Sequence, residues 1–262
     1  MSESDNGFKA RIYAVTGGTQ GVGEAVALAL ARAGAAGVTI CGRNVENGAR
    51  VKQAIAAAGA AAEFVQADLE KPEDCRSVIA ACDKSFGRVD GVVNAAGITD
   101  RGTIEDTTVE QWDRMFAINV RAPFILMQDA IKLMKRDGAP GSIVNIITMS
   151  AHGGQPKLTA YSAAKGALAV LTKNVAYSVR FDRIRVNGIN LGWTDTPNEH
   201  KVQRWEGQPE EWVEKAGAVL PFGRLIGADD VARLCLFLLG PDSGVMTGSV
   251  IDYDQQVMGA FD

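Results

Sequence analysis

The stretch Thr16-Gly17-Gly18-Thr19-Gln20-Gly21-Val22-Gly23 decides the fold of this chain. It follows the short apolar run 11–16 and precedes the alanine-rich segment 21–33, so we expect a strand, a glycine turn and a helix. Glycines let backbone N–H groups approach a pyrophosphate without side chains in the way, and the helix N-terminus adds partial positive charge. The G-x3-G-x-G spacing therefore predicts a dinucleotide-binding turn, although glycine turns also follow strands where no ligand binds.

The composition is that of an ordinary globular protein. The 262 residues are 47% hydrophobic and carry 27 Lys+Arg against 31 Asp+Glu, enough chain for a sizeable core in one domain. The pI of about 5.4 argues against a nucleic-acid partner, because phosphate contacts need clustered basic residues. No uncharged apolar run approaches the ~20 residues of a membrane span, and the polar start 1–7 lacks a signal-peptide core. We expect a cytoplasmic protein without membrane contacts.

Short β-rich runs alternate with longer helical segments. The expected strands are 11–16, 37–42, 62–67, 91–94, 142–148, 185–190 and 249–253, and the expected helices are 21–33, 47–58, 72–86, 108–136 and 159–181. The first six strands are continuously apolar, as parallel strands buried on both faces are. We predict an α/β fold with a single Rossmann-like, doubly wound parallel sheet of about seven strands and helices on both faces. This domain spans 9–262, after a flexible tail at 1–8.

One segment, 193–220, interrupts the alternation and contains Trp193, Trp205, Trp212 and His200. Two interpretations stay open. A long excursion after a strand's carboxyl end is where a substrate lid lies. Alternatively, it is a surface helical hairpin whose tryptophans pack on a neighbouring subunit.

A metal site is not expected. The four cysteines (Cys41, Cys75, Cys82 and Cys235) lie far apart without a CxxC motif, and there are only two histidines. We expect the cysteines to be small core residues in a reducing compartment.

Tyr161 and Lys165 carry the chemistry that the sequence suggests. Residues four apart share one side of a helix, so an ammonium would lie beside a phenol. A nearby positive charge favours the phenolate and lowers a pKa that starts near 10. Such a tyrosine can take a proton from an alcohol or give one to a developing alkoxide.

Several motifs together resemble the short-chain dehydrogenase/reductase family from about residue 8 to residue 254. They are Thr16-Gly-x3-Gly-x-Gly23, Asp68-Leu69, Asn94-Ala95-Ala96-Gly97, Asn119-Val120, Thr148 and Tyr161-x3-Lys165. The resemblance implies an oxidoreductase that moves hydride between a nicotinamide cofactor and a small ketone or secondary alcohol. A sugar or polyol is one such substrate, and Tyr161 is the implied general acid/base.

The resemblance also implies roles for single residues. Lys165 would bind the nicotinamide ribose, and Asn119 would hold a water in a proton relay with it. Thr148 stands where the family usually has Ser, and it keeps the hydroxyl that would polarise a carbonyl. Ser150 is a rival donor, which would share a face with Thr148 if the strand continued that far.

The expected cofactor contacts come from several motifs. They are Gly17, Thr19, Gln20, Gly21, Val22, Gly23, Arg43, Asp68, Leu69, Asn94, Ala95, Tyr161, Lys165, Thr194 and Thr196. Position 42, where a carboxylate would bind a ribose 2′-OH, is Gly42, and Arg43 could clamp a 2′-phosphate. We therefore expect NADP(H) to be preferred, with NAD(H) as the alternative. The sequence departs from the family at Leu191, usually Pro, and at Gln255-Gln256, usually Gly-Gly.

The substrate side is less defined. Ser150, His152, Gln155 and Trp193 could line a polar pocket for a small molecule, or each could be a surface or packing residue. Alternatives to the small-molecule enzyme are a carrier-linked 3-oxoacyl reductase and a nucleotide-sensing binding protein that has lost turnover. The family resemblance implies a homo-oligomer, a dimer or tetramer, formed by the long helices that carry Asn119 and Tyr161.

Overall fold

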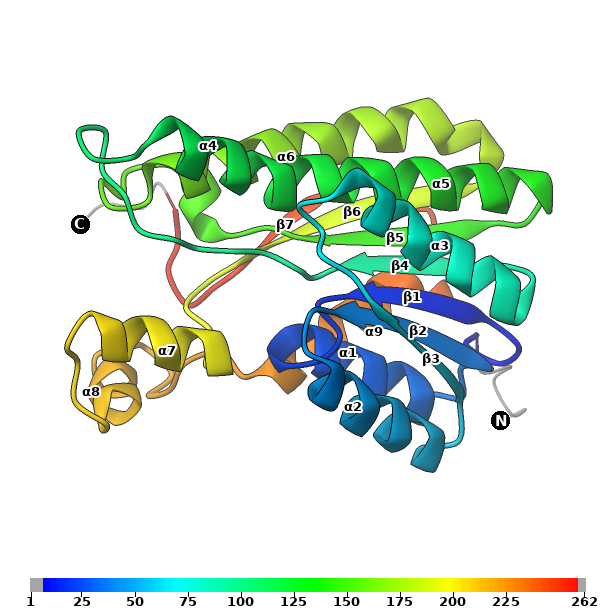
Figure 1. The fold of residues 1–262 in the computed structure, drawn as a ribbon, viewed down its shortest axis with the longest axis horizontal. Coiled ribbons are helices and arrows are strands. Elements are labelled where there is room, and N and C mark those ends of the chain that lie inside the picture. The colour runs from blue at the N-terminus through cyan, green and yellow to red at the C-terminus, as the bar shows by residue number, and fades with distance from the viewer. Residues whose placement is uncertain (1–6, 259–262) are drawn as a thin grey trace.

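The computed structural model describes residues 7–258 and contains, within them, a parallel sheet of seven strands in the order β3-β2-β1-β4-β5-β6-β7 (Figure 1). The strands are β1 (Ile12–Thr16), β2 (Gly37–Gly42), β3 (Ala61–Gln66), β4 (Gly91–Asn94), β5 (Gly141–Ile146), β6 (Ile184–Leu191) and β7 (Val250–Tyr253). The predicted α/β fold is confirmed. The strand order reverses between β1 and β4, and in open parallel sheets ligands bind beyond the strand ends at such a point.

Helices cover both faces of this sheet. They are α1 (Gly21–Arg32), α2 (Val45–Ala57), α3 (Pro72–Phe86), α4 (Val109–Phe116), α5 (Ala122–Arg136), α6 (Thr159–Val179), α7 (Pro197–Trp205), α8 (Trp212–Ala218) and α9 (Ala228–Leu239). In Figure 1, α3, α5 and α6 lie on one side of the sheet and α1, α2 and α9 on the other. Alternate residues of β1 explain the two cores, because Ile12 and Ala14 join the first layer, whereas Tyr13 and Val15 join the second.

Three elements differ from the sequence expectation. Helix α9 was not predicted; it packs on α1 and begins with Asp229 and Asp230 in its first turn. The single helix expected at 108–136 is instead α4 and α5 joined by the π-helical turn Ala117–Arg121. Strand β5 ends at Ile146 rather than at 148, because Thr148 begins a 3-10 turn over Met149–His152.

The structure also describes part of the predicted N-terminal tail and the whole 193–220 segment. Residues 1–6 of the predicted tail lie outside the described residues, whereas Phe8 packs against the ring of Tyr13 at 6.0 Å between centroids. The 193–220 segment contains the short helices α7 and α8. The four cysteines are buried and unpaired, as expected. Between residues 7 and 258, no helix is both long and apolar enough to cross a membrane.

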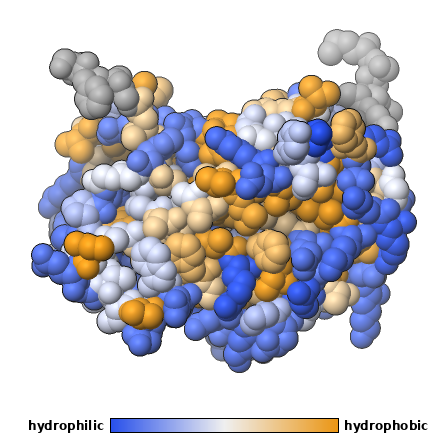
Figure 2. Space-filling view, turned by 90° about the horizontal axis from the view of Figure 1, so that it is seen from above, coloured by the Kyte–Doolittle hydropathy of each residue, from blue (hydrophilic) through white to orange (hydrophobic). Residues whose placement is uncertain are grey.

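The outer face of α5 and α6 exposes large apolar side chains. Phe124 is 43% exposed, Val170 59%, and Phe181, which follows α6, 86%. Figure 2, which views the molecule from this side, shows apolar residues gathered along the middle of the face with polar residues around them. Monomeric proteins rarely leave such side chains together in water, so this face has the character of a contact surface.

Candidate active site

The glycine turn after β1 forms a cradle of main chain. Gly17 and Gly21 have φ values of +64° and +55°, which glycine adopts at little cost. A Cβ added to Gly23 would lie 2.3 Å from the Gly17 carbonyl oxygen, so helix and turn approach more closely than a side chain allows. Gln20 precedes α1 and makes no side-chain capping hydrogen bond, which leaves the helix start to a ligand. The turn therefore has the geometry of an anion site.

Two polar residues tie this cradle to the neighbouring strand. The Thr16 hydroxyl accepts hydrogen bonds from the N–H groups of Ala95 (3.1 Å) and Ala96 (3.2 Å). Asn94 was expected to contact the cofactor, but its Nδ2 donates to Asn145 Oδ1 at 2.8 Å inside the sheet. Asn94 is not among the residues that line the cavity, and its Oδ1 has no hydrogen-bond partner among residues 7–258, so its contact with the cofactor stays a prediction.

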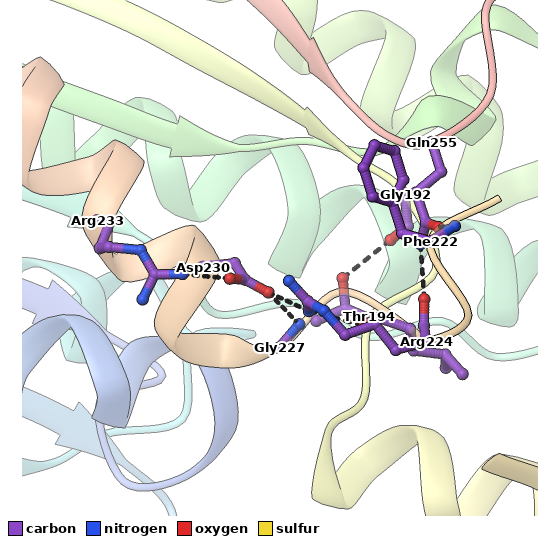
Figure 3. Close-up of polar contacts among 9 residues, drawn as sticks. Gly192, Thr194, Phe222, Arg224, Gly227, Asp230, Arg233 and Gln255 are labelled. Carbon is purple, nitrogen blue, oxygen red and sulfur yellow. Dashed lines mark hydrogen bonds and ion pairs between the residues drawn. The ribbon is translucent and has the colours of Figure 1, made fainter. Parts of the chain in front are cut away.

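A cavity of about 280 Å³ opens beyond the ends of β1 and β4. Most predicted cofactor residues line it, namely Gly17, Thr19, Gln20, Gly21, Val22, Gly23, Arg43, Asp68, Leu69, Ala95 and Thr196. Thr194 does not line it; its hydroxyl donates to the Gly192 carbonyl at 2.9 Å (Figure 3). The lining also includes Ile98, Ile118, Ile146, Pro197 and Asn198, which motif spacing did not single out as cofactor contacts, because the topology brings them together.

The end of β2 leaves no room for a carboxylate. A Cβ added to Gly42 would lie 2.6 Å from the Thr19 hydroxyl oxygen, so Thr19 occupies the space that a side chain at 42 would need. Arg43 follows on the cavity wall and is exposed. The positive charge of Arg43 thus has no acidic side chain beside it at position 42.

Tyr161 lies on the first turn of α6, next to Thr148 at the end of the β5 segment. Desolvation raises the pKa of Tyr161 from 10.0 to about 12, while a hydrogen bond with the Thr148 side chain and the charge of Arg101 lower it. The phenol was expected to have its pKa lowered by Lys165. That expectation is wrong for the protein without ligands, because burial outweighs the groups that favour the phenolate.

Lys165 is buried one helical turn further on, with its Nζ 6.0 Å from the centre of the Tyr161 ring. The Nζ donates to the Ile146 carbonyl at 2.8 Å, so the amine points to the end of β5. Burial lowers the pKa of Lys165 from 10.5 to about 8. Ile146 lines the cavity, whereas Tyr161 and Lys165, which were both expected to contact the cofactor, are not among the lining residues.

Asn119 lies in the π-helical turn between α4 and α5 and is fully buried. Its Nδ2 donates to the Ile98 carbonyl at 3.0 Å, and its Oδ1 accepts from the Ile98 N–H at 3.3 Å. A Cβ added to Gly97 would lie 2.8 Å from Asn119 Oδ1 and 3.5 Å from Lys165 Nζ, so both side chains close on Gly97. Single π turns inside helices occur often at functional sites, and this one aims Asn119 inward.

Thr148 and Ser150 have different partners. Thr148 begins the 3-10 turn, and its hydroxyl oxygen accepts a hydrogen bond from the Ser150 N–H at 3.2 Å. The condition for Ser150 as rival donor, a strand extending to 150, is not met. The Ser150 hydroxyl donates to Gln155 Oε1 at 2.9 Å, which leaves Thr148 as the hydroxyl beside Tyr161.

His152 and Trp193 belong to two separate side-chain clusters. His152 Nε2 lies 3.0 Å from Asp252 Oδ1, and Asn190 Nδ2 donates to the same oxygen at 2.7 Å. Trp193 stacks on Trp212, with 5.8 Å between ring centroids. The tryptophans of the excursion thus include a pair that packs within the chain, a possibility that neither sequence interpretation contained.

Polar contacts with Gln255 and Asp230 hold the residues that connect the excursion to α9, and we call these contacts the clamp. Gln255 accepts from the Phe222 N–H at 2.9 Å and donates to the Arg224 carbonyl at 2.7 Å (Figure 3). Asp230 binds the side chains of Arg224 and Arg233 and accepts from the Gly227 N–H at 2.9 Å, and these contacts lower the pKa of its carboxyl. The Gln255 amide thus holds the end of the 193–227 segment, which comprises the 193–220 excursion and the residues between it and α9. A glycine at position 255 would have no side chain to make these hydrogen bonds.

Among residues 7–258, no three His, Cys, Asp or Glu side chains gather where they could hold a metal ion.

Known proteins share both this sequence and this fold. A family model described as enoyl-(acyl carrier protein) reductase matches residues 17–255. The chain is 36% identical to the D-beta-hydroxybutyrate dehydrogenase of Rhizobium meliloti, covering 92% of this chain and 95% of the relative. It is 31% identical to the NADP-dependent (R)-specific alcohol dehydrogenase of Lentilactobacillus kefiri, covering 92% and 94%.

A solved structure gives the same result. A variant of actinorhodin polyketide ketoreductase crystallised with NADPH superimposes with a TM-score of 0.88 at 27% identity, covering 94% of this chain and 96% of that one. Similarity over nearly the whole length, together with the glycine turn and the Tyr161-x3-Lys165 pair, leaves one conclusion. The chain belongs to the short-chain dehydrogenase/reductase family of oxidoreductases.

Proposed function

We propose that the protein transfers hydride between a nicotinamide cofactor and a small ketone or secondary alcohol, with Tyr161 as general acid and base. One observation carries the proposal: the buried Lys165 amine lies 6.0 Å from the centre of the Tyr161 ring and donates to the carbonyl of Ile146, a residue of the cavity wall, while the Thr148 hydroxyl lowers the pKa of Tyr161. Relatives named as dehydrogenases for an alcohol and for D-beta-hydroxybutyrate support this class of substrate.

Thr148 and Tyr161 divide the work on the substrate oxygen. The Thr148 hydroxyl donates a hydrogen bond that polarises a carbonyl, and Tyr161 gives a proton as negative charge develops on that oxygen. In the oxidative direction Tyr161 takes the proton back. Because burial raises the pKa of Tyr161 to about 12, the free protein holds the phenol protonated.

Lys165 and Asn119 serve Tyr161 and the cofactor. The Lys165 ammonium favours the phenolate by its charge and is a hydrogen-bond donor for a ribose hydroxyl. The side chains of Asn119 and Lys165 both lie close to Gly97, so a water bound between them would complete a proton path to Tyr161. A nicotinamide, when bound, supplies the hydride or accepts it, and its oxidised form adds positive charge.

The cavity residues fit a dinucleotide. The turn from Gly17 to Gly23 exposes main chain, and side chains added there would collide with neighbouring atoms. The uncapped start of α1 suits a pyrophosphate. Asp68, Leu69 and Thr196 line the cavity, and the first two would contact an adenine ring.

A spectrophotometric screen tests the activity. Purified protein, with NADPH or NADH, is offered a panel of ketones, and with the oxidised cofactors a panel of alcohols and polyols, while absorbance of the reduced nicotinamide is followed. We expect turnover of at least one carbonyl. Tight cofactor binding without turnover across the panel would instead favour the nucleotide-sensing alternative.

NADP(H) is the cofactor that we propose is preferred, because Arg43 is exposed on the cavity wall and position 42 has no carboxylate. Replacing Arg43 by alanine should lower kcat/KM with NADPH roughly tenfold and leave kcat/KM with NADH nearly unchanged. An equal effect on both coenzymes would show that Arg43 does not contact a 2′-phosphate.

The apolar face of α5 and α6 is the surface through which we propose that copies of the chain pair, as a dimer or as part of a tetramer. Phe124, Val170 and Phe181 are exposed there, and burying such a face is favourable. Sedimentation should give a dimer or tetramer for the wild type, and Phe124→Glu should shift it toward monomer. A monomeric wild type at micromolar concentration would contradict the proposal.

A further inference from the structure

Arg101 is a partly buried arginine that no motif identified. It lies in the segment between β4 and α4, and its side chain is 19% exposed. Two main-chain contacts of the adjacent Gly102 fix it to the start of α6: the Gly102 N–H donates to the Lys157 carbonyl at 2.9 Å, and the Thr159 N–H donates to the Gly102 carbonyl at 3.2 Å. Arg101 thus stands on chain that is bonded to the residues just before Tyr161.

Arg101 forms an ion pair with Glu199 of α7. Arg101 Nη2 lies 4.0 Å from Glu199 Oε1, and the charge of Arg101 lowers the pKa of Tyr161, whereas that of Glu199 raises it. Glu199 belongs to α7, which also contributes Pro197 and Asn198 to the cavity wall. A substrate held by Tyr161 would therefore lie near both charges.

Most of the hydrogen-bonding capacity of Arg101 is unused. Its Nε donates to Glu206 Oε1 at 3.1 Å, but its Nη2 lies 4.0 Å from Glu199 Oε1, beyond hydrogen-bond length. Neither Nη1 nor Nη2 donates a hydrogen bond to any residue in 7–258. A guanidinium carries five N–H donors, so four are open to a ligand.

Glu199 is occupied elsewhere. Its Oε1 accepts hydrogen bonds from Trp193 Nε1 at 2.9 Å and from Gln203 Nε2 at 2.8 Å. The Glu199 carboxylate is thus hydrogen-bonded to neutral donors on its own segment, and it pairs with Arg101 by charge at 4.0 Å without taking a hydrogen bond from the two Nη groups. Glu206, which is the hydrogen-bonded partner of Arg101, is itself 26% exposed, and such partly exposed pairs contribute little to stability.

We propose that Arg101 binds a carboxylate on the substrate, so that the enzyme prefers an oxo acid or hydroxy acid over its uncharged analogue. This inference rests on the proposed function. The planar guanidinium with two free Nη groups matches a carboxylate bidentately, and the contacts of Gly102 hold it relative to α6. A bound carboxylate would fix the distance from its own group to the carbonyl that Tyr161 protonates.

The test compares acids with their esters. Acetoacetate and levulinate, with their methyl esters, are reduced by the wild type, Arg101→Gln, Arg101→Lys, Glu206→Gln and, as a control, Arg114→Gln. Arg114 forms surface ion pairs with Asp100 and Glu70 in the same region. We expect the wild type to favour at least one acid over its ester, and Arg101→Gln to lose roughly ten- to hundredfold in kcat/KM for that acid, mainly through KM.

The ester and the two further variants separate this role from others. Methyl-ester reduction should change less than about threefold in Arg101→Gln, and Arg101→Lys should recover part of the loss. Glu206→Gln should retain or increase the preference for the acid, because it removes a competing carboxylate. If Arg101 only fastened α7, Arg101→Gln and Glu206→Gln would lower acid and ester activity alike, and the proposal would be overturned.

Two further outcomes distinguish a failure of this inference from a failure of the proposed function. A wild type that reduces esters as well as acids, with no charge-dependent loss in Arg101→Gln, overturns this inference and leaves the proposed function standing. A wild type that binds NADPH but reduces no carbonyl overturns the proposed function itself. Circular dichroism and NADPH affinity of each variant establish that a loss does not come from misfolding.

Discussion

The cofactor cavity and the 193–227 segment are built from different parts of the chain. The cavity is shaped by main chain: Gly17 has a positive φ, and a Cβ added to Gly23 would lie 2.3 Å from the Gly17 carbonyl oxygen. In the 193–227 segment a main-chain bridge joins the two ends at Thr194 and Ile226, and side chains supply further contacts, such as the Trp193–Glu199 hydrogen bond and the contacts of Gln255 (Figure 3).

This difference bears on what each region can recognise. Main-chain geometry admits few substitutions, so the cradle suits a ligand part that does not vary, such as a pyrophosphate. Side-chain contacts can be exchanged one at a time with modest cost, so the segment opposite can be adapted to a particular substrate. Substitutions can test how far the two regions are separable.

The largest expected effect is on the residue that serves the substrate side. Tyr161→Phe should lower kcat by about 10²- to 10⁴-fold, because the proton donor is lost, while the Kd for the cofactor changes little. Steady-state kinetics and fluorescence titration with NADPH measure the two quantities. Tyr177→Phe, on the exposed side of the same helix, is the control. Full turnover by Tyr161→Phe would show that the phenol is not the acid/base.

Lys165 is expected to make stability depend on pH. Burial lowers its pKa from 10.5 to about 8, so between those values the unfolded chain binds more protons than the native one. The contribution of Lys165 to the free energy of unfolding should therefore rise by about 2 kcal/mol from about pH 8 to about pH 10. The four buried cysteine thiols, whose pKa values burial raises, lower the free energy of unfolding over the same range, so the contribution of Lys165 is measured as the wild type minus Lys165→Met in urea titrations at each pH.

The exposed Lys173 on the same helix supplies the matched control, because Lys173→Met should leave the pH slope of the wild type in place. An unchanged slope in Lys165→Met would mean that the buried amine keeps its charge over this range.

Gly23→Ala tests the cradle. The added Cβ would meet the Gly17 carbonyl at 2.3 Å, and this contact is with backbone that cannot turn aside. We expect a loss of about 1–3 kcal/mol in unfolding free energy and a weaker affinity for NADPH. Gly166→Ala on α6 meets only the Ala151 carbonyl at 3.6 Å and should be neutral or stabilising by up to ~1 kcal/mol. Equal effects of the two substitutions would refute the close-approach argument.

The smallest effect is expected at the clamp. Gln255→Ala removes the hydrogen bonds to Phe222 and Arg224, so unfolding free energy should fall by about 1 kcal/mol and substrate KM should rise a few-fold. NADPH affinity should stay the same, because the clamp lies in the other region. Gln208→Ala, at an exposed position of the same segment, is the comparison. A change in NADPH affinity alone would place Gln255 on the cofactor side.

The sheet and most of the cofactor contacts could be predicted because they depend on local pattern. Continuous apolar runs mark the buried strands, and glycine spacing marks the turn between β1 and α1. The hydrogen bond of Asn94 could not be predicted, since its partner, Asn145, lies 51 residues further along the chain. The π turn at Asn119 and the end of β5 likewise depend on packing that no local pattern encodes.

By itself, the sequence determined the parallel α/β sheet, the main-chain cradle and the pairing of a tyrosine with a lysine on one side of a helix, because period and spacing are local properties. The tertiary structure alone decided the electrostatics and the substrate side. Burial raised the pKa of Tyr161 where the neighbouring charge predicted a decrease, and the contact of Gly102 with the start of α6 joined the chain that carries Arg101 to the helix of Tyr161. Desolvation and long-range contacts exist only once distant segments of the chain have packed together.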